Sequence, residues 1–257
     1  MGSKKYILSQ TSKGAAMKHI AVIPARKGSM GVVNKNQLLF NKTADFIEAS
    51  RLYDEILVTT NDPVIQEMAQ KRGYRVRVRP DTLAGSYDPI KPSFTDLIEN
   101  MDVPKDAYLW LFYLTHVFRD HKDHEAAHRM VIEENSTSLM LFLPAKTHPF
   151  RCWGQDPKTG EMYKFIEDNR VSRQEYPSAW WNNHYLCCVR ADSLDTVNNN
   201  LIGPKTTPIY FTEAQGDRLV DIDEYADIVN WSKRYPEDYA KWWKSLPPEK
   251  RVGPEPA

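Results

Sequence analysis

HIAVIPARKGSMGVVNKN, residues 19–36, is the most informative segment of this 257-residue chain. A short apolar run over 19–24 passes directly into a turn that holds two glycines and is flanked by cations. Glycine adopts positive φ and lets a backbone approach a ligand closely, so the N–H groups of such a turn can point at phosphate oxygens. Arg26 could bind a phosphate through two parallel hydrogen bonds, and Lys35 adds a mobile point charge. The pattern alone leaves open an ordinary strand-to-helix turn with solvated charges.

Beyond this stretch, apolar segments of strand length alternate with helical patterns. Strands are predicted at 55–60, 75–79, 107–114 and 137–143, with helices at 62–73 and about 122–134. Strands that alternate with helices imply right-handed crossovers, so we predict an α/β fold with three layers and a mainly parallel sheet. Ligands bind such sheets outside the carboxyl ends of the strands, where the glycine turn lies.

One segment, 144–182, breaks this alternation because it is rich in Pro, Trp, Lys and Arg and has little periodicity. We interpret it as an inserted arm or small lobe within one α/β domain spanning 18–246. Residues 1–17 are expected to be a disordered leader, and 247–257 a loose tail. A single Trp-rich amphipathic helix is predicted from Glu224 to about Trp243.

The composition excludes several classes of protein. The 34 basic and 34 acidic side chains cancel, so a general nucleic-acid binder is excluded and no nucleic-acid partner is expected. No apolar run approaches the roughly 20 residues of a membrane span, and no secretory signal is visible, so no membrane partner is expected. The three cysteines, Cys152, Cys187 and Cys188, lack metal-site spacing and favour a reduced, cytoplasmic location.

A second motif, Val220-Asp221-Ile222-Asp223, lies near the carboxyl end. In a strand, side chains at i and i+2 share one face about 6.5 to 7 Å apart. Two carboxylates so placed repel each other unless a cation sits between them, and oxygen-only ligands suit Mg²⁺. The alternative is a helix N-cap, because a helix is predicted to begin at Glu224.

Together these motifs resemble the acylneuraminate cytidylyltransferases, or CMP-sialic acid synthetases. The family pattern I-P-A-R-x-G-S-K-G-x-x-x-K-N is matched by IPARKGSMGVVNKN at every fixed position except Met30. Further collinear matches, covering roughly 18–230, are TTND at 59–62, RPDTLAG at 79–85, HPFR at 148–151, RQEYP at 173–177 with Asn183 following, and VDID at 220–223.

The resemblance implies a fold like that of the nucleotide-diphospho-sugar transferases, with the arm serving homodimerisation. It also implies transfer of CMP from CTP to an acidic 2-keto sugar, with release of pyrophosphate and Mg²⁺ as cofactor. Catalysis would fall to Arg26, Lys35, Asp221 and Asp223, with the two aspartates holding the metal. The nucleotide-binding residues implied are Ala25, Arg26, Gly28, Ser29, Gly31, Lys35 and Asn36. The acceptor-binding residues implied are Tyr113, Thr115, Arg119, Arg151, Arg173, Gln174 and Asn183.

The departures from the family pattern concentrate where the acceptor should bind. The family stretch L-L-Q-P-T-S-P-L-R appears here as LFYLTHVFR, residues 111–119, so Tyr113 replaces the glutamine that contacts the acceptor. His184 replaces the glycine of N-G-A-I-Y. Two interpretations stay open beside the sialic acid-like acceptor: a different acceptor such as a phosphonate, or a homologue that binds nucleotide without turnover. A sugar-transferring enzyme that uses Asp-x-Asp fits less well, because such enzymes usually carry that motif in mid-chain.

Four histidines lie close together in the sequence, at His116, His121, His124 and His128. Zinc would tolerate this spacing, but the intervening charged residues favour a solvated helix start. The tryptophans and the adjacent pair Cys187 and Cys188 are expected to be packing residues.

Overall fold

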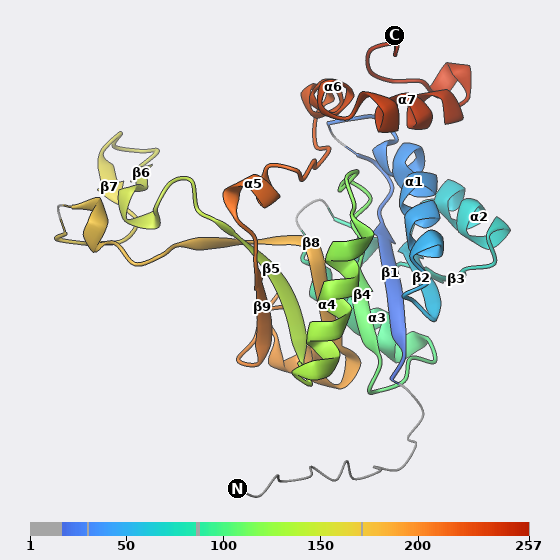
Figure 1. Cartoon of the computed structure of the whole chain (residues 1–257), viewed down its shortest axis with the longest axis horizontal. Helices are drawn as coiled ribbons and strands as arrows, with labels where there is room; N and C mark the ends of the chain where they lie inside the picture. Colours follow the sequence, from blue (N-terminus) through green and yellow to red (C-terminus); the bar gives the residue numbers. More distant parts are fainter. Residues whose placement is uncertain (1–16, 30, 86–87, 171, 257) are drawn as a thin grey trace, which may run out of the picture.

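The computed structural model describes residues 17–29, 31–85, 88–170 and 172–256, without the side chain of Arg173. The expected leader up to residue 16 and the substituted position Met30 lie outside the described residues. The centre of the molecule is a seven-stranded sheet with the order β3-β2-β1-β4-β8-β5-β9 (Figure 1). Its strands are β1 (His19–Ala25), β2 (Glu55–Thr60), β3 (Arg75–Val78), β4 (Tyr108–Leu111), β5 (Ser138–Pro144), β8 (Trp180–Arg190) and β9 (Thr206–Tyr210).

The sheet is mainly parallel, as the sequence predicted. β1 pairs in parallel with β2 and β4, β2 with β3, and β5 with β9. The exception is β8, which runs antiparallel to both β4 and β5. Every residue of β1 is buried, as expected of a central strand covered on both faces.

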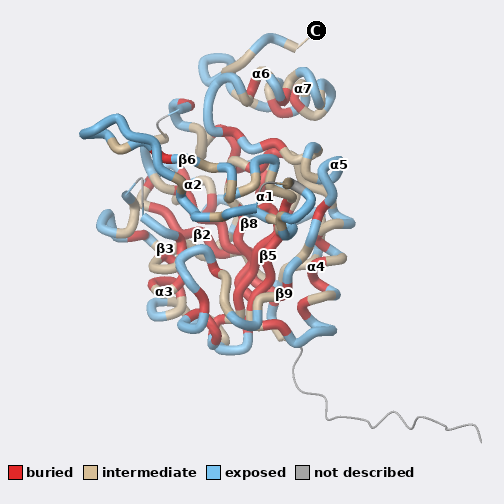
Figure 2. Tube along the Cα trace, turned by 90° about the vertical axis from the view of Figure 1, so that its left-hand side faces the viewer, coloured by how far each residue is buried: buried red, intermediate tan, exposed pale blue. Residues whose placement is uncertain are grey.

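Helices cover both faces of the sheet and make the three layers. The α-helices of the described residues are α1 (Lys35–Ser50), α2 (Pro63–Lys71), α3 (Ile90–Asn100), α4 (His121–Glu133), α5 (Glu213–Gly216), α6 (Tyr225–Arg234) and α7 (Pro236–Ser245). Residues of α1, α2 and α4 share one hydrophobic core with alternate residues of β1, while α3 packs on the opposite face against Ile20 and Val22. Figure 2 shows the buried strands between these two exposed layers.

The C-terminal helix is divided in two, whereas one continuous helix was predicted. α6 ends at Arg234 and α7 begins at Pro236. Proline has no N–H group and its ring clashes with the preceding turn, so it ends one helix and suits the first position of the next. The tail beyond α7 packs back onto it, since the Tyr239 hydroxyl donates to the carbonyls of Val252 and Pro254 at 3.2 and 2.8 Å.

The arm projects from the sheet between β5 and β8 (Figure 1). It ends in a two-stranded hairpin of β6 (Trp153–Gln155) and β7 (Met162–Lys164). At its base, Ala145 N donates to Ala179 O at 2.9 Å, directly before β8 begins at Trp180. The last residues of the predicted segment 144–182 therefore belong to the sheet.

The expectation of solvated histidines on α4 was wrong for two of them. His124 and His128 are both buried. The His128 ring stacks on Trp110 at 4.1 Å between ring centroids and on His19 at 4.5 Å. Their polar sequence neighbours lie on the exposed face of the same helix. The sequence pattern therefore gives no clear sign that one face of this helix, with both histidines, is buried. Cys187 and Cys188 are buried and unpaired, as predicted.

Candidate active site

The turn after β1 is held by its own side chains. Gly28 has φ of 77°, the left-handed conformation for which glycine was expected there. Arg26 Nη1 donates to Gly28 O at 2.8 Å, and Asn36 Nδ2 donates to Arg26 O at 2.9 Å. Lys27 N also donates to Asn61 Oδ1 at 2.7 Å, so the loop after β2 supports the turn from the side.

The acidic segment 220–223 pairs with the chain that follows β4. Val117 N donates to Val220 O at 3.1 Å, Ile222 N donates to Thr115 O at 2.9 Å, and His116 and Asp221 form an antiparallel bridge. The segment is thus extended, so the side chains of Asp221 and Asp223 alternate with buried Val220 and Ile222 and share one face.

The glycine turn and the acidic segment meet. Lys35 Nζ donates to Ile222 O at 2.6 Å and lies 3.1 Å from Asp223 Oδ1. The Lys35 side chain is 11% exposed and that of Asp223 is 76% exposed, so the pair stands at the edge of the solvent. A Cβ atom built on Gly31 would lie 2.1 Å from Asp223 O, so only glycine fits at this contact. Two motifs far apart in the sequence therefore form one site.

Beside this contact lies a cleft of about 270 Å³. Seven of the residues predicted from the sequence line it: Arg26, Ser29, Lys35, Asn36, Tyr113, Thr115 and Asp223. The sequence assigned no binding role to the other lining residues, although Arg79, Leu83 and Gly85 belong to the family-like stretch 79–85. These other residues are Pro24, Arg79, Leu83, Gly85, Asp88, Pro89, Ile90, Ser93 and Leu114.

Arg79 is the most informative of these additional residues. Its residue surface is 6% exposed, and its guanidinium donates to Thr59 Oγ1 at 3.2 Å and to Thr59 O at 2.9 Å. Among the described residues it has no carboxylate within 4.0 Å. Burial lowers the pKa of Arg79 to about 10, so the group is still a cation at neutral pH. The sequence signal was the Arg-Pro of residues 79–80, but only the fold shows that Arg79 faces the cleft.

An aromatic cluster stands at the end of the cleft where the family pattern fails. The Tyr113 ring meets the His184 ring edge to face, at 5.5 Å between centroids. Burial raises the pKa of Tyr113, so its phenol is neutral near pH 7. Burial lowers the pKa of His116 to about 4, although its Nδ1 lies 3.8 Å from Asp221 Oδ1. Burial also lowers the pKa of His184. The site therefore presents neutral rings here and charges at the glycine turn.

Several predicted residues lie away from the cleft. Arg119 donates from Nη2 to Tyr113 O at 2.6 Å and packs on the Phe112 ring. Asn183 lies in β8, where its side chain accepts from Tyr185 N at 2.8 Å. Arg151 and Gln174 belong to the arm and do not line the cleft, and the arm also holds Arg173. Ala25 is buried as the last residue of β1.

The carboxylates of Asp221 and Asp223 supply oxygen donors of the kind that Mg²⁺ prefers. Both side chains reach solvent, with Asp221 beside His116 and Asp223 at the cleft. In the part of the chain that is described, no cluster of three or more His, Cys, Asp or Glu side chains could hold a metal. The residues fit a Mg²⁺ ion that keeps several waters and takes further ligands from a substrate phosphate, as Mg²⁺ sites commonly do. Within the same residues, no helix has the length and apolar character needed to cross a membrane.

Comparison with known proteins gives partial matches in sequence. No protein-family model matches the chain. Over 98 residues the chain is 34% identical to the N-acylneuraminate cytidylyltransferase of Streptococcus agalactiae serotype V, and equally to those of serotypes III and Ia. The match covers 34% of this chain and 24% of the relative, so it spans about a quarter of that protein's length. The chain is a distant homologue of these proteins over that segment, which confirms the resemblance in sequence.

Solved structures match over nearly the whole fold. CMP:2-keto-3-deoxy-manno-octonic acid synthetase, solved in complex with CTP, superposes with a TM-score of 0.60 at 12% identity, covering 86% of this chain and 99% of that one. The 4-diphosphocytidyl-2C-methyl-D-erythritol synthase of Anaerococcus prevotii superposes with a TM-score of 0.57 at 10% identity, with the same coverage. The fold is therefore that of the nucleotide-diphospho-sugar transferases, as predicted.

Proposed function

We propose that the protein is a CTP-dependent cytidylyltransferase that transfers CMP to an acidic 2-keto sugar and releases pyrophosphate. The contact between Lys35 and Asp223 carries this proposal. It joins a glycine turn of the kind that binds phosphates to a pair of carboxylates of the kind that binds Mg²⁺. The sequence homology to N-acylneuraminate cytidylyltransferases supports the same chemistry. The function would be carried out at the carboxyl end of the sheet, where open α/β sheets bind their ligands.

The cations of the cleft would hold the nucleotide. Arg26 and Lys35 would bind the triphosphate, and the turn formed by Gly28, Ser29 and Gly31 would offer backbone N–H groups to it. Asn36 already fixes the Arg26 carbonyl at 2.9 Å and so keeps the turn in shape. Arg79, buried and without a carboxylate partner in the described chain, would donate to the base or ribose, and Ser93 lines the same cleft.

The reaction itself asks for positioning and charge neutralisation more than for covalent chemistry. A hydroxyl oxygen of the acceptor would attack the α-phosphorus of CTP and lose its proton to solvent water. A new P–O bond would form while the bond from the α-phosphorus to the oxygen that bridges it to the β-phosphate breaks. The electron pair of that bond would leave with pyrophosphate, whose developing charge Arg26 and Lys35 would stabilise. Mg²⁺, held by Asp221 and Asp223, would supply further neutralisation of phosphate charge.

The acceptor would lie beside Tyr113 and Thr115, at the end of the cleft nearest Asp221. Arg151 and Gln174 would reach an acceptor from the arm of a second copy, in a homodimer formed through this arm. The arm carries exposed apolar side chains suited to such an interface: Trp153, Met162, Tyr163, Phe165 and Ile166. Arg119 would act on the acceptor site indirectly, through its bond to the Tyr113 carbonyl.

The specific alternative is a homologue that binds the nucleotide without turning it over, or that uses another acceptor such as a phosphonate. The observation that favours it is the contact of Tyr113, which lines the cleft, with the ring of His184. Pyrophosphate release from CTP and Mg²⁺, measured across a panel of 2-keto sugar acids and phosphonates, separates the cases. Release with a sugar acid, lost in Arg26→Ala, supports the proposal. Tight CTP binding without release across the panel refutes it.

A further inference from the structure

A second and larger cavity, of about 870 Å³, lies between α1, α2, α7 and the segment 116–119. Its volume falls in the range of about 300 to 1,000 Å³ that is typical of sites for small organic molecules. It shares no lining residue with the cleft, although His116, which lies beside Asp221, lines the second cavity. Lys35 and Asn36, at the start of α1, line the cleft, whereas Leu38, Lys42 and later residues of α1 line the second cavity. The two cavities are therefore separate.

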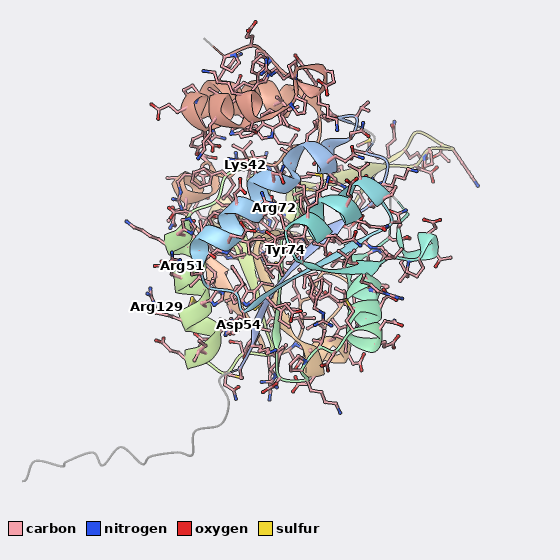
Figure 3. The ribbon with its side chains drawn as sticks, turned by 90° about the vertical axis from the view of Figure 1, so that its right-hand side faces the viewer. Lys42, Arg51, Asp54, Arg72, Tyr74 and Arg129 are labelled. Atoms are coloured by element: carbon pink, nitrogen blue, oxygen red, sulfur yellow. The ribbon has the colours of Figure 1, made fainter. Side chains whose placement is uncertain are left out.

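The charges that line this cavity do not balance. Its three carboxylates each have a partner within the lining: Asp45 pairs with Arg72 at 2.6 Å, Glu67 with Lys71 at 2.5 Å, and Asp238 with Lys42 at 2.5 Å. Three further cations of the lining, Arg119, Lys241 and Lys250, have no carboxylate within 4.0 Å in the described chain. Figure 3 shows Lys42 on α1 and Arg72 after α2, on the face of the molecule turned to the viewer. The cavity thus carries an excess of positive charge.

The positive charges are close enough to act on one another. Burial lowers the pKa of Lys42, Asp238 opposes this, and the positive charges of Arg119 and Lys241 lower it further. Like charges placed together disfavour ionisation, and an anion between them relieves the repulsion.

Arg119 is held by aromatic rings and a backbone carbonyl instead of by a carboxylate. Its guanidinium carbon lies 4.9 Å from the Phe112 ring centroid and 5.9 Å from that of Phe46. Within the described residues, its guanidinium makes one hydrogen bond, from Nη2 to Tyr113 O. Its Nε and Nη1 are buried and have no hydrogen-bond partner among those residues. Lys42, which pairs with Asp238, also has its Nζ 5.2 Å from the Trp231 ring centroid. Aromatic faces attract a cation but leave its charge in place, so the cavity keeps its positive potential.

The remaining lining suits a ligand with a flat, apolar body. Four aromatic side chains line the cavity: Phe46, Phe118, Tyr235 and Trp242. Aromatic faces stack on planar rings, and each stacked base is worth about 1 to 3 kcal/mol in nucleic-acid complexes. A cavity that joins such faces to uncompensated cations matches a phosphate group attached to an aromatic ring system.

We propose that this cavity is a second binding site, separate from the active site, for a phosphorylated aromatic ligand of the nucleotide class. Lys241 and Lys250 would meet the phosphate at the open side, with the buried charge of Arg119 behind them. The aromatic side chains would contact the base. The site does not depend on the proposed cytidylyltransferase activity, because no residue of the cleft contributes to it.

Methionine-methyl NMR tests this proposal directly, because Met68 lines the cavity. The probe is CMP, titrated into protein labelled with ¹³C at the methionine methyl groups. Arg26→Ala is the starting protein, so that binding in the cleft is weakened. We expect a saturable shift of the Met68 methyl signal with CMP and none with cytidine, which has the same base but no phosphate.

The paired variants decide the role of the cations. Lys241→Ala/Lys250→Ala should weaken the CMP response of Met68 by about tenfold, which corresponds to about 1.4 kcal/mol. Lys244→Ala is the matched control, because Lys244 is an exposed lysine of the same helix α7 that does not line the cavity. The proposal is overturned by an absent Met68 response, by an equal response to cytidine, or by equal CMP affinity in the double variant and the control.

Discussion

The Lys35 ammonium lies 3.1 Å from the Asp223 carboxylate, although 188 positions separate the two residues in the chain. The fold brings them together because the turn after β1 and the segment bridged to His116 both lie at one end of the sheet. Lys35 donates both to the carbonyl of Ile222 and to the carboxylate of Asp223, so it holds the acidic segment at two points. The pair would exchange these contacts for phosphate and metal when a nucleotide binds.

Removing either proposed metal-binding carboxylate should abolish most turnover. We expect Asp221→Asn or Asp223→Asn to lower kcat by about 10² to 10³-fold, the scale on which a preorganised electrostatic group contributes. Asp217→Asn is the control, since Asp217 is an exposed aspartate that pairs with Lys146 and does not line the cleft. Circular dichroism checks that all three variants fold. Full activity in both site variants would remove the acidic pair from the mechanism.

The close contact at Gly31 predicts a steric effect. In Gly31→Ala the new methyl group would overlap Asp223 O, so we expect a loss of activity and of about 1 to 3 kcal/mol of stability from overpacking. Gly73→Ala is the comparison. Gly73 has a positive φ of 75° but open space where the new Cβ would lie, so this variant should show the effect of backbone strain alone. Activity that falls less in Gly31→Ala than in Gly73→Ala would contradict the packing of the turn against the acidic segment. Assays at one fixed CTP concentration and urea unfolding measure the two effects.

Buried histidines should make the protein sensitive to acid. Burial lowers the pKa of His128 to about 3 and that of His116 to about 4 in the folded chain, whereas an unfolded histidine titrates near 6.5. The unfolded state therefore binds more protons between these values, so stability is complete above about pH 6.5 and falls as the pH drops toward 3 to 4. Each such histidine adds a slope of up to about 1.4 kcal/mol per pH unit in that window.

The variant His128→Phe tests this assignment. It keeps an aromatic ring against Trp110 and removes the titrating group. The number of protons taken up on unfolding, given by the slope of unfolding free energy against pH, should therefore fall by up to one. His121→Phe, on the exposed face of the same helix, is the control. Equal slopes for wild type and His128→Phe between pH 4 and 6 would show that this ring already carries its proton in the fold.

The pair Tyr113 and His184 should control which acceptor is used. Replacing both by the family residues, Tyr113→Gln with His184→Gly, opens the space between the rings and should change kcat/KM for acceptors by about tenfold or more. KM for CTP should change little, because the turn and Arg79 remain. Steady-state kinetics with both substrates separate these effects. A change confined to the KM of CTP would place the pair at the nucleotide.

The exposed side chains of the arm predict self-association. We expect a dimer for the wild-type chain, and Phe165→Asp should weaken it because a buried charge at an apolar interface is costly. Ile132→Asp on α4 is the control, an exposed apolar residue on the body of the molecule. Sedimentation velocity over a range of concentrations reports the outcome. A monomeric wild type at all concentrations would argue against a role of the arm in pairing.

Much of the fold followed from local sequence patterns. The continuous apolar runs became β1 and β5. The helix predicted at 62–73 became α2, with Asp62 Oδ1 accepting from Val64 N at 2.9 Å. Such features are local, because burial on both faces and helix capping each leave a short signature. The antiparallel direction of β8 had no such signature, since it depends on pairing with strands far away in the sequence.

The site shows the same division between local and distant causes. The motifs pointed to Arg26, Lys35 and Asp223, which the fold gathers at the cleft. Arg79 was visible as part of a motif, but its orientation depends on the carbonyl and hydroxyl of Thr59 in a neighbouring strand. The second cavity could not be foreseen, because its lining comes from helices at both ends of the chain.

Following each phosphate of CTP tests the central proposal most directly. Protein, Mg²⁺ and a panel of 2-keto sugar acids are incubated with CTP labelled either at the α-phosphate or at the γ-phosphate. We expect the α-label to appear in a product joined to the sugar acid, while the γ-label leaves in pyrophosphate. Transfer of the γ-label to the acceptor, or an α-label that stays in CTP with every acceptor, would contradict it.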